Sequence, residues 1–159
     1  MVTSAPSLRS LRCLGLRLEV GPDRRPQVRG PTNVLRGPTF TALLPYRPRL
    51  IAEWCLSTRP PPDLEWDSTL AEGVAGLVTD VWAELDPGGI ALEYAYAHRR
   101  TQCLRAWYSA QGQFRAAEEG HDLILLAAAG RRAILAYAAL APPRVRRPDA
   151  AGAVAGSIR

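Results

Sequence analysis

The apolar residues between Asp67 and Asp86 constrain the fold more than any other feature of the sequence. They recur at intervals of three and four positions, which places them on one stripe of an α-helix. These residues are Leu70, Val74, Leu77, Val78, Val81 and Leu85. Ser68 or Thr69 can cap the helix, and Pro87-Gly88-Gly89 ends it. The sequence therefore predicts one main α-helix, residues 68–85, whose apolar stripe must pack on a partner surface.

The segment that follows this helix changes to a period of two, which is typical of β-strands. Residues 90–98 alternate large and small side chains, and two short turns would continue the chain as antiparallel hairpins. This register sets His98 opposite Cys103 across the first hairpin. One face of the predicted sheet would then carry the aromatic residues Trp54, Tyr94, Tyr96, Trp107 and Phe114.

Residues 122–140 have two interpretations. A third hairpin would turn at Ala129-Gly130-Arg131 and carry apolar residues on both faces, which implies burial of both. The alternative is an Ala- and Leu-rich helix that breaks at Gly130, which intrinsic helix propensity prefers. We favour the hairpin because the aliphatic run is short, is interrupted by Gly and Arg-Arg, and follows other predicted strands.

The region before the main helix is rich in proline, which disfavours helices. Nine prolines fall between residues 22 and 62, at positions 22, 26, 31, 38, 45, 48, 60, 61 and 62. Residues 22–48 are therefore predicted to be mostly irregular. Residues 13–20 and 49–57 alternate well enough to be strands.

These elements predict an α+β fold, an antiparallel β-sheet of about five to six strands packed on helix 68–85, with an irregular Pro-rich N-terminal region. One domain is the usual organisation for a chain of 159 residues. The predicted parts are a flexible N-terminus over residues 1–12, a single α+β domain over 13–141 and a disordered basic tail over 142–159.

The composition indicates an intracellular protein, cytoplasmic or, if the source is viral or eukaryotic, nuclear, that is not secreted. Apolar residues make up 47% of the chain, but no run reaches the ~18 uninterrupted apolar residues of a membrane span. Residues 1–12 lack the apolar block of a signal peptide. The three cysteines have no short metal-ligand spacing, so we predict no disulfide framework, no metal site and no cofactor.

The charges are distributed unevenly along the chain. All twenty basic residues are Arg and none is Lys, which codon bias in a high-GC genome explains, since Ala, Gly and Pro are abundant as well. Residues 1–60 hold ten Arg against three acidic residues, a charge of +7; residues 61–143 hold six against eleven, a charge of −5; residues 144–159 hold four against one, a charge of +3. Basic arms therefore flank an acidic central region.

Two groups of side chains suggest chemistry. His98 and Cys103, facing each other across a hairpin, would resemble an activated thiol, since a neighbouring imidazole lowers a thiol pKa. The pattern supplies no acid to orient the imidazole and no oxyanion donors, so simple packing is the favoured interpretation and no catalytic residue is predicted. His121 lies beside three acidic residues, but a solvated turn explains this group better than a metal site.

The sequence as a whole favours a small regulatory or adaptor protein that binds other proteins and catalyses no reaction, with a homodimer through the last hairpin as one expected assembly. The predicted partner-binding residues are Arg99, Arg100, Arg131, Arg132, Arg144, Arg146 and Arg147. If the hairpins stack, the four guanidinium groups at their tips converge. One alternative is a nucleic-acid-binding protein whose Arg-rich arms and hairpin tips neutralise phosphates. Another is a small enzyme or ligand-binding domain that uses His98 and Cys103.

Overall fold

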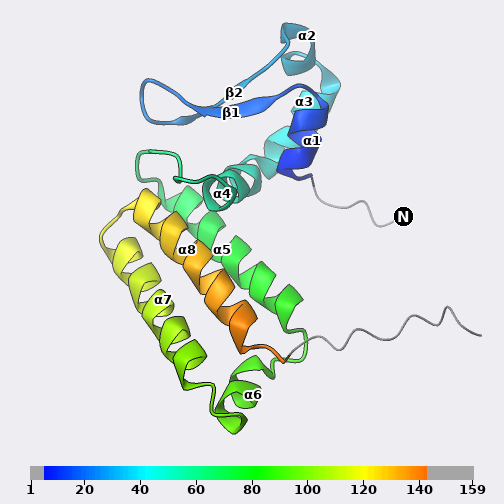
Figure 1. Ribbon diagram of the computed structural model, residues 1–159. Helices are drawn as coiled ribbons and strands as arrows, with labels where there is room; N and C mark the ends of the chain where they lie inside the picture. The colour runs from blue at the N-terminus through cyan, green and yellow to red at the C-terminus, as the bar shows by residue number, and fades with distance from the viewer. Residues whose placement is uncertain (1–5, 143–159) are drawn as a thin grey trace, which may run out of the picture.

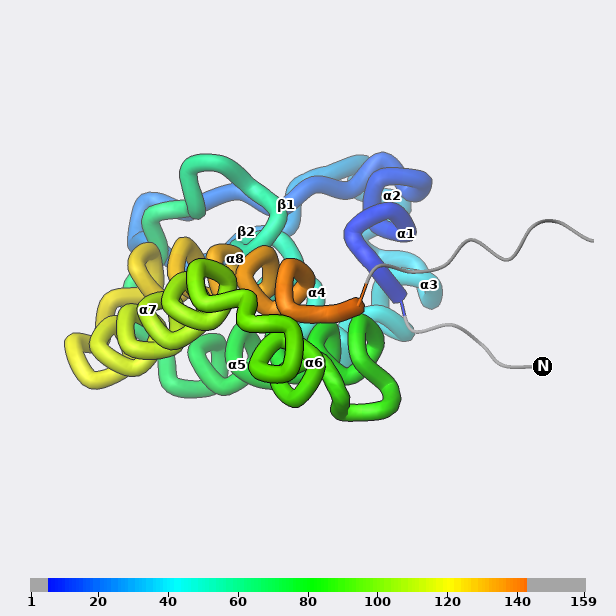
Figure 2. Tube along the Cα trace, turned by 60° about the horizontal axis from the view of Figure 1, so that its bottom comes forward, coloured from blue at the N-terminus to red at the C-terminus, as the bar shows by residue number. Residues whose placement is uncertain are grey.

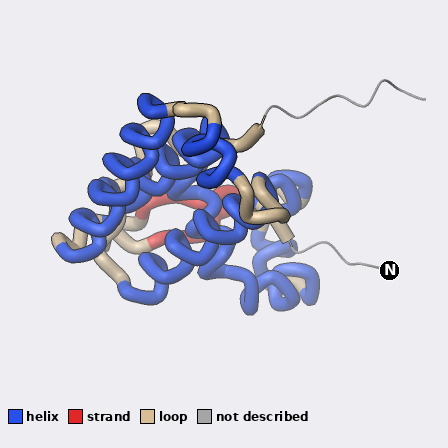
Figure 3. The backbone as a smooth tube through the Cα atoms, turned by 90° about the horizontal axis from the view of Figure 1, so that it is seen from below, coloured by secondary structure: helices blue, strands red, loops and turns tan. Residues whose placement is uncertain are grey.

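The computed structural model describes residues 6–142, and most of them are helical (Figure 1). In chain order the elements are α1 (Leu8–Cys13), β1 (Arg17–Val20), β2 (Pro26–Arg29), α2 (Thr32–Leu35), α3 (Pro38–Leu43), the 3-10 turn Leu44–Tyr46, α4 (Arg47–Ser57), α5 (Ser68–Leu85), α6 (Ala91–Ala97), α7 (Thr101–Glu119) and α8 (Leu123–Leu140). The predicted α+β fold is wrong. In place of a sheet of five to six strands, the described residues form one antiparallel hairpin, β1–β2, which Figure 3 shows among the helices.

Helix α5 confirms the predicted main helix at both of its ends, Ser68 and Leu85. Its N-cap is Asp67, whose side chain accepts a hydrogen bond from the N–H of Leu70 at 3.0 Å. A carboxylate in this position satisfies one of the free N–H groups of the first turn. The predicted caps, Ser68 and Thr69, lie inside the helix instead.

The strands predicted between residues 90 and 118 are wrong, because this part of the chain forms α6 and α7. The buried residues of α7 are spaced as one side of a helix requires: Leu104, Trp107, Ala110 and Ala117. In α6 the buried residues are Ala91 and Ala95, one helical turn apart. Alanine is the best helix former, and a buried stripe made of alanines leaves the large side chains outside it. In residues 90–98 these large side chains alternate with small ones along the sequence, and this alternation is the period of two that predicted a strand.

Residues 123–140 form helix α8, so the predicted third hairpin is wrong, and the alternative of a helix holds except for its predicted break at Gly130. Asp122 caps the helix by accepting a hydrogen bond from the N–H of Leu125 at 2.9 Å. The helix continues through Gly130 without a break.

The N-terminal predictions are corrected in a similar way. Residues 49–57, predicted as a strand, belong to α4, and only Arg17–Val20 of the predicted strand 13–20 is extended. Helix α1 includes part of the segment predicted to be flexible, and its Leu11 is buried. Of the predicted basic tail, residues 143–159 lie outside the described residues.

The long helices pack side by side, with α8 between α7 and α5 (Figures 1 and 2). Helix α4 packs on α5 and on α8 near the start of α8, and α6 packs on the other end of α7 and α8. The hairpin and α1–α3 lie beyond α4 (Figure 1). The buried core accordingly has three clusters, which include Ala52, Val74 and Leu126 beside α4, Ala91, Trp107 and Leu140 beside α6, and Leu11, Leu16 and Leu50 in the N-terminal part.

Gly130 lies where α8 meets α4, α5 and α7. A Cβ atom at this position would lie 3.0 Å from Val78 of α5, 3.1 Å from Phe114 of α7 and 3.2 Å from Leu56 of α4. These distances are shorter than the optimal separation of ~3.5–4.0 Å between carbon atoms. The missing side chain therefore allows the close approach of the helices.

We expect Gly130→Leu to lower the free energy of unfolding by about 2–3 kcal/mol, because the new side chain overpacks a filled junction. Gly76→Leu is the matched control, since a Cβ at the exposed Gly76 of α5 would have no neighbour within 4 Å. That control should raise the free energy of unfolding by about 0.5–1 kcal/mol through helix propensity. Urea denaturation of both variants measures the difference, and equal effects would contradict the packing described at Gly130.

Candidate functional site

The side of α8 that faces away from the core carries a row of residues, which we call the outer stripe: Leu125, Ala128, Arg132, Leu135 and Ala139. Ala128 is half-buried, and the other four are exposed. Leu125 is 56% exposed and Leu135 is 58% exposed. Only 39% of the residues of this strongly apolar helix are buried. The chain therefore leaves a large part of its most apolar helix in contact with solvent.

A row of small and uncharged residues on α7 lies beside the outer stripe. Arg132 donates a hydrogen bond to the side-chain oxygen of Gln113, and the amide nitrogen of Gln113 lies 3.5 Å from the hydroxyl of Ser109. Ala106 and Ala116, both exposed, continue this row by helical spacing. Together the outer stripe and the row Ala106, Ser109, Gln113 and Ala116 form the α7/α8 face, and these two rows contain one charged residue, Arg132.

A groove of about 360 Å³ lies on this face where the end of α7 meets the start of α8. Small residues form half of its lining, namely Ala116, Ala117, Gly120 and Ala129, and the rest is Gln113, Asp122, Leu125 and Arg132. Grooves lined by small side chains accept larger side chains of a partner helix, which is a common mode of helix recognition.

By length and composition, α8 could also cross a membrane, which is weak support for such a role because core helices of soluble proteins pass the same test. Arg131 and Arg132 lie in the middle of the helix, where a charge is most costly in a bilayer. The contacts of Arg131 with α4 fit a helix that packs within a bundle.

The Arg131 side chain stabilises the C-terminal end of α4. Its Nε donates to the carbonyl oxygen of Leu56 at 2.7 Å, and Nη2 donates to the carbonyl oxygens of Cys55 and Thr58. These carbonyls lack partners within the helix, and a cation is favourable at this end of the helix dipole. Partial burial, with the nearby charge of Arg59, lowers the pKa of Arg131. Arg131 is thus occupied inside the fold and is not free for a partner.

The four arginines predicted at hairpin tips do not converge. Arg99 and Arg100 lie at the turn between α6 and α7, where Arg100 donates to the carbonyl oxygen of Ala141 at 3.2 Å. Ala141 follows Arg131 by ten residues, which corresponds to about 15 Å along a helix. Arg132 is on the α7/α8 face, and Arg99 is exposed. The predicted Arg144, Arg146 and Arg147 lie outside the described residues.

His98 and Cys103 do not form the pair that the hairpin register suggested. The His98 ring stacks on Tyr94 with 4.0 Å between centroids, and its Nδ1 lies 2.9 Å from the Tyr94 carbonyl oxygen. Cys103 packs against the core cluster beside α6. Burial raises the pKa of a second thiol, that of Cys55, to about 12, which keeps it protonated and unreactive at neutral pH. His121 packs against Trp66, with 4.9 Å between centroids.

The aromatic residues expected on one sheet face are dispersed. Trp107 is buried against Trp82 and Tyr137, with centroid distances of 4.7 and 5.0 Å. Tyr96 is exposed, and its hydroxyl lies 2.6 Å from that of Tyr108. Tyr94 stacks on His98, while Trp54 and Phe114 pack beside the core cluster near α4. A base-stacking platform therefore does not form from this set.

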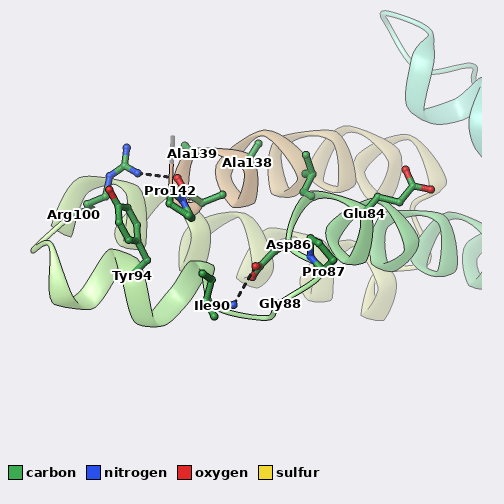
Figure 4. A pocket seen from close by; sticks show the side chains of 12 residues that line it. Glu84, Asp86, Pro87, Gly88, Ile90, Tyr94, Arg100, Ala138, Ala139 and Pro142 are labelled. Atoms are coloured by element: carbon green, nitrogen blue, oxygen red, sulfur yellow. Dashed lines mark hydrogen bonds between the residues drawn. The ribbon is translucent and has the colours of Figure 1, made fainter. Parts of the chain in front are cut away.

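An open cavity of about 910 Å³ lies where α5, α6 and the end of α8 meet (Figure 4). Asp86 lies beside it, and its carboxylate accepts hydrogen bonds from the N–H groups of Ile90 at 3.0 Å and Ala91 at 2.8 Å and from the hydroxyl of Tyr137 at 3.0 Å. Burial disfavours the ionised carboxylate, but these donors outweigh it and lower the pKa of Asp86. Burial and the contact with Asp86 raise the pKa of Tyr137. The Asp86 carboxylate and the Tyr137 hydroxyl therefore have hydrogen-bond partners within the protein, which indicates that they stabilise the fold.

Sequence reasoning missed the outer stripe, because it placed Leu125 and Leu135 on the buried face of a sheet. Their spacing contained the signal, since Leu125, Ala128, Arg132, Leu135 and Ala139 follow each other at alternating intervals of three and four. The chain matches no protein-family model, no curated protein and no solved structure.

The two adjacent arginines of α8 should differ in their effect on stability. We expect Arg131→Ala to lower the free energy of unfolding by about 2 kcal/mol, because it removes charged hydrogen bonds to the end of α4. Arg132→Ala should change it by less than about 0.5 kcal/mol, as for other exposed positions. Chemical denaturation of both variants tests this, and similar losses would contradict the capping role of Arg131.

We expect Asp86→Ala to lower the free energy of unfolding by about 2 kcal/mol near neutral pH, because α6 loses its capping carboxylate and Tyr137 loses an acceptor. A lowered pKa means that the carboxylate stabilises the fold above its ordinary pKa of 3.8 and that this contribution is lost as the pH falls below that value. The difference between wild type and variant should therefore shrink below pH ~4 in denaturation measurements. Asp80→Ala, on the exposed partner of Arg49, is the control and should cost less than about 0.5 kcal/mol.

Proposed function

We propose that this protein is a small intracellular regulatory or adaptor protein that works by binding a protein partner through the α7/α8 face. The observation that carries the proposal is the exposure of α8. An apolar helix with 39% of its residues buried holds Leu125 and Leu135 more than half exposed. Single exposed leucines are ordinary on protein surfaces, but two that share one helix face with small uncharged neighbours form a patch suited to a partner.

The charge distribution around this face supports the same proposal. Charged residues are depleted at the centres of protein interfaces and common at their rims. The two rows of the α7/α8 face contain one charged residue, Arg132, and Asp122 lies at the edge of its groove, whereas Arg105, Arg115, Glu118 and Glu119 are exposed elsewhere on α7. A face with few charges at its centre and more around it suits burial by another protein.

The nucleic-acid alternative has weaker support. Four arginines of the β1–β2 region already face carboxylates: Arg17 and Arg29 pair with Glu19, Arg24 with Asp63 and Arg25 with Glu65. These pairs lower the positive potential that attracts phosphates. Exposed pairs of this kind contribute little to stability, so their main effect is on the local charge.

Photo-crosslinking tests the proposed binding face. Leu135 is replaced by the photoreactive residue p-benzoylphenylalanine, and Thr39, exposed on α3 in the N-terminal part, carries it in the control. Irradiation in an extract of the source organism should give a protein adduct of defined mass from position 135 and little from position 39, because a partner covers only the first position. Equal yields at the two positions would overturn the proposal.

A further inference from the structure

The outer stripe has the spacing of a coiled-coil seam. Its residues 125, 128, 132, 135 and 139 follow the alternation of three and four that keeps one helix facing another along its length. The row on α7, residues 106, 109, 113 and 116, has the same alternation. A seam of this kind fits a helix better than it fits an extended segment or a loop.

We propose that the helix that docks on this seam is α8 of a second copy of the chain, running antiparallel to the first about a two-fold axis. The inference rests on the proposed function, because it names the partner of the α7/α8 face. In a two-fold interface the same residues are used by both copies, so the face must be complementary to itself.

One antiparallel register pairs both leucines of each copy with leucines of the other. When Leu125 lies opposite Leu135 of the second copy, Arg132 lies opposite Ala128, and symmetry repeats both contacts. The leucines then pack on each other at two layers. At the centre of the seam the short side chain of Ala128 lies opposite the long side chain of Arg132. The aliphatic part of Arg132 can therefore cross the seam while its guanidinium group stays in solvent.

The charges favour this face over other surfaces for self-association. The chain carries a net charge of +5, so two copies repel each other in general. Contact through the hairpin would bury the exposed ion pairs of Arg17, Arg24, Arg25 and Arg29, whereas the outer stripe contributes one Arg per copy. Removing ion pairs from water costs free energy that their mutual attraction often does not repay.

The area of the face determines how tightly two copies of the chain are expected to associate. The seam from residue 125 to 139 is about 21 Å long, and two helices side by side are about 18–20 Å wide, which gives a footprint of about 400 Å². Stable dimers bury about 800 Å² on each partner, so a weak, reversible dimer with a dissociation constant in the micromolar range is expected.

Sedimentation velocity of the purified full-length chain from about 1 to 200 μM tests the association. We expect a monomer–dimer equilibrium in this range, and Leu125→Glu combined with Leu135→Glu should weaken it by about 100-fold or more, because four carboxylates would enter the seam. Leu44→Glu is the control, since Leu44 is 48% exposed outside the helical bundle and should leave association unchanged. A monomer at all concentrations, or a dimer that the double variant leaves intact, overturns the inference.

Disulfide trapping tests the register. Cys13, which is exposed, is first replaced by Ser. A mixture of the Leu125→Cys and Leu135→Cys chains should form disulfide dimers, whereas each chain alone should not, because equal positions lie about 15 Å apart along the seam and a disulfide needs Cα atoms within ~7 Å. Trapping in either separate chain, or no disulfide dimer in the mixture, overturns the register. If the purified chain is monomeric and the extract gives an adduct with another protein, the homodimer is excluded and the proposed function stands.

Discussion

Helix α8 can pack against α4, α5 and α7 together because Gly130 has no side chain at their meeting point. The residues around it on the buried side are also small, namely Ala127, Ala129 and Ala133. Small side chains let helix axes approach closely. In such a closely packed junction even one added methylene group changes the stability. The same approach brings Arg131 within reach of the last carbonyl groups of α4, so the junction joins apolar packing to a helix cap.

This junction also explains why the outer stripe exists. One side of α8 packs against α4, α5, α6 and α7, and no described element covers the opposite side, where Leu125 and Leu135 lie. Neither leucine can reach the core without rotating the helix and displacing Gly130 from the junction. The exposed seam is therefore a fixed feature of the fold, held in place by the packing behind it.

The sequence predicted α5 correctly because its buried stripe consists of large aliphatic residues at helical spacing, with clear ends. It predicted α6 to α8 wrongly because their buried sides are largely alanine, as at Ala91, Ala95 and Ala110, and alanine gives little hydrophobic contrast. The seven residues of α6 alternate between small and large side chains, and so short an alternation fits a strand as well as a helix. The role of Arg131 could not be predicted, since its acceptors are backbone carbonyls about 75 positions away in the chain. The outer stripe could have been found once residues 123–140 were read as a helix.

Arg132 is the one residue of the seam that apolar packing alone does not explain. Leucine there would bury more apolar surface, but it would stabilise several registers equally. A polar residue at a central seam position costs stability and selects one alignment. A shift of one helical repeat would set Arg132 against Leu135 of the second copy in place of Ala128, or would carry one leucine beyond the end of the seam. In the proposed dimer, Arg132 therefore favours the symmetric register over the shifted ones.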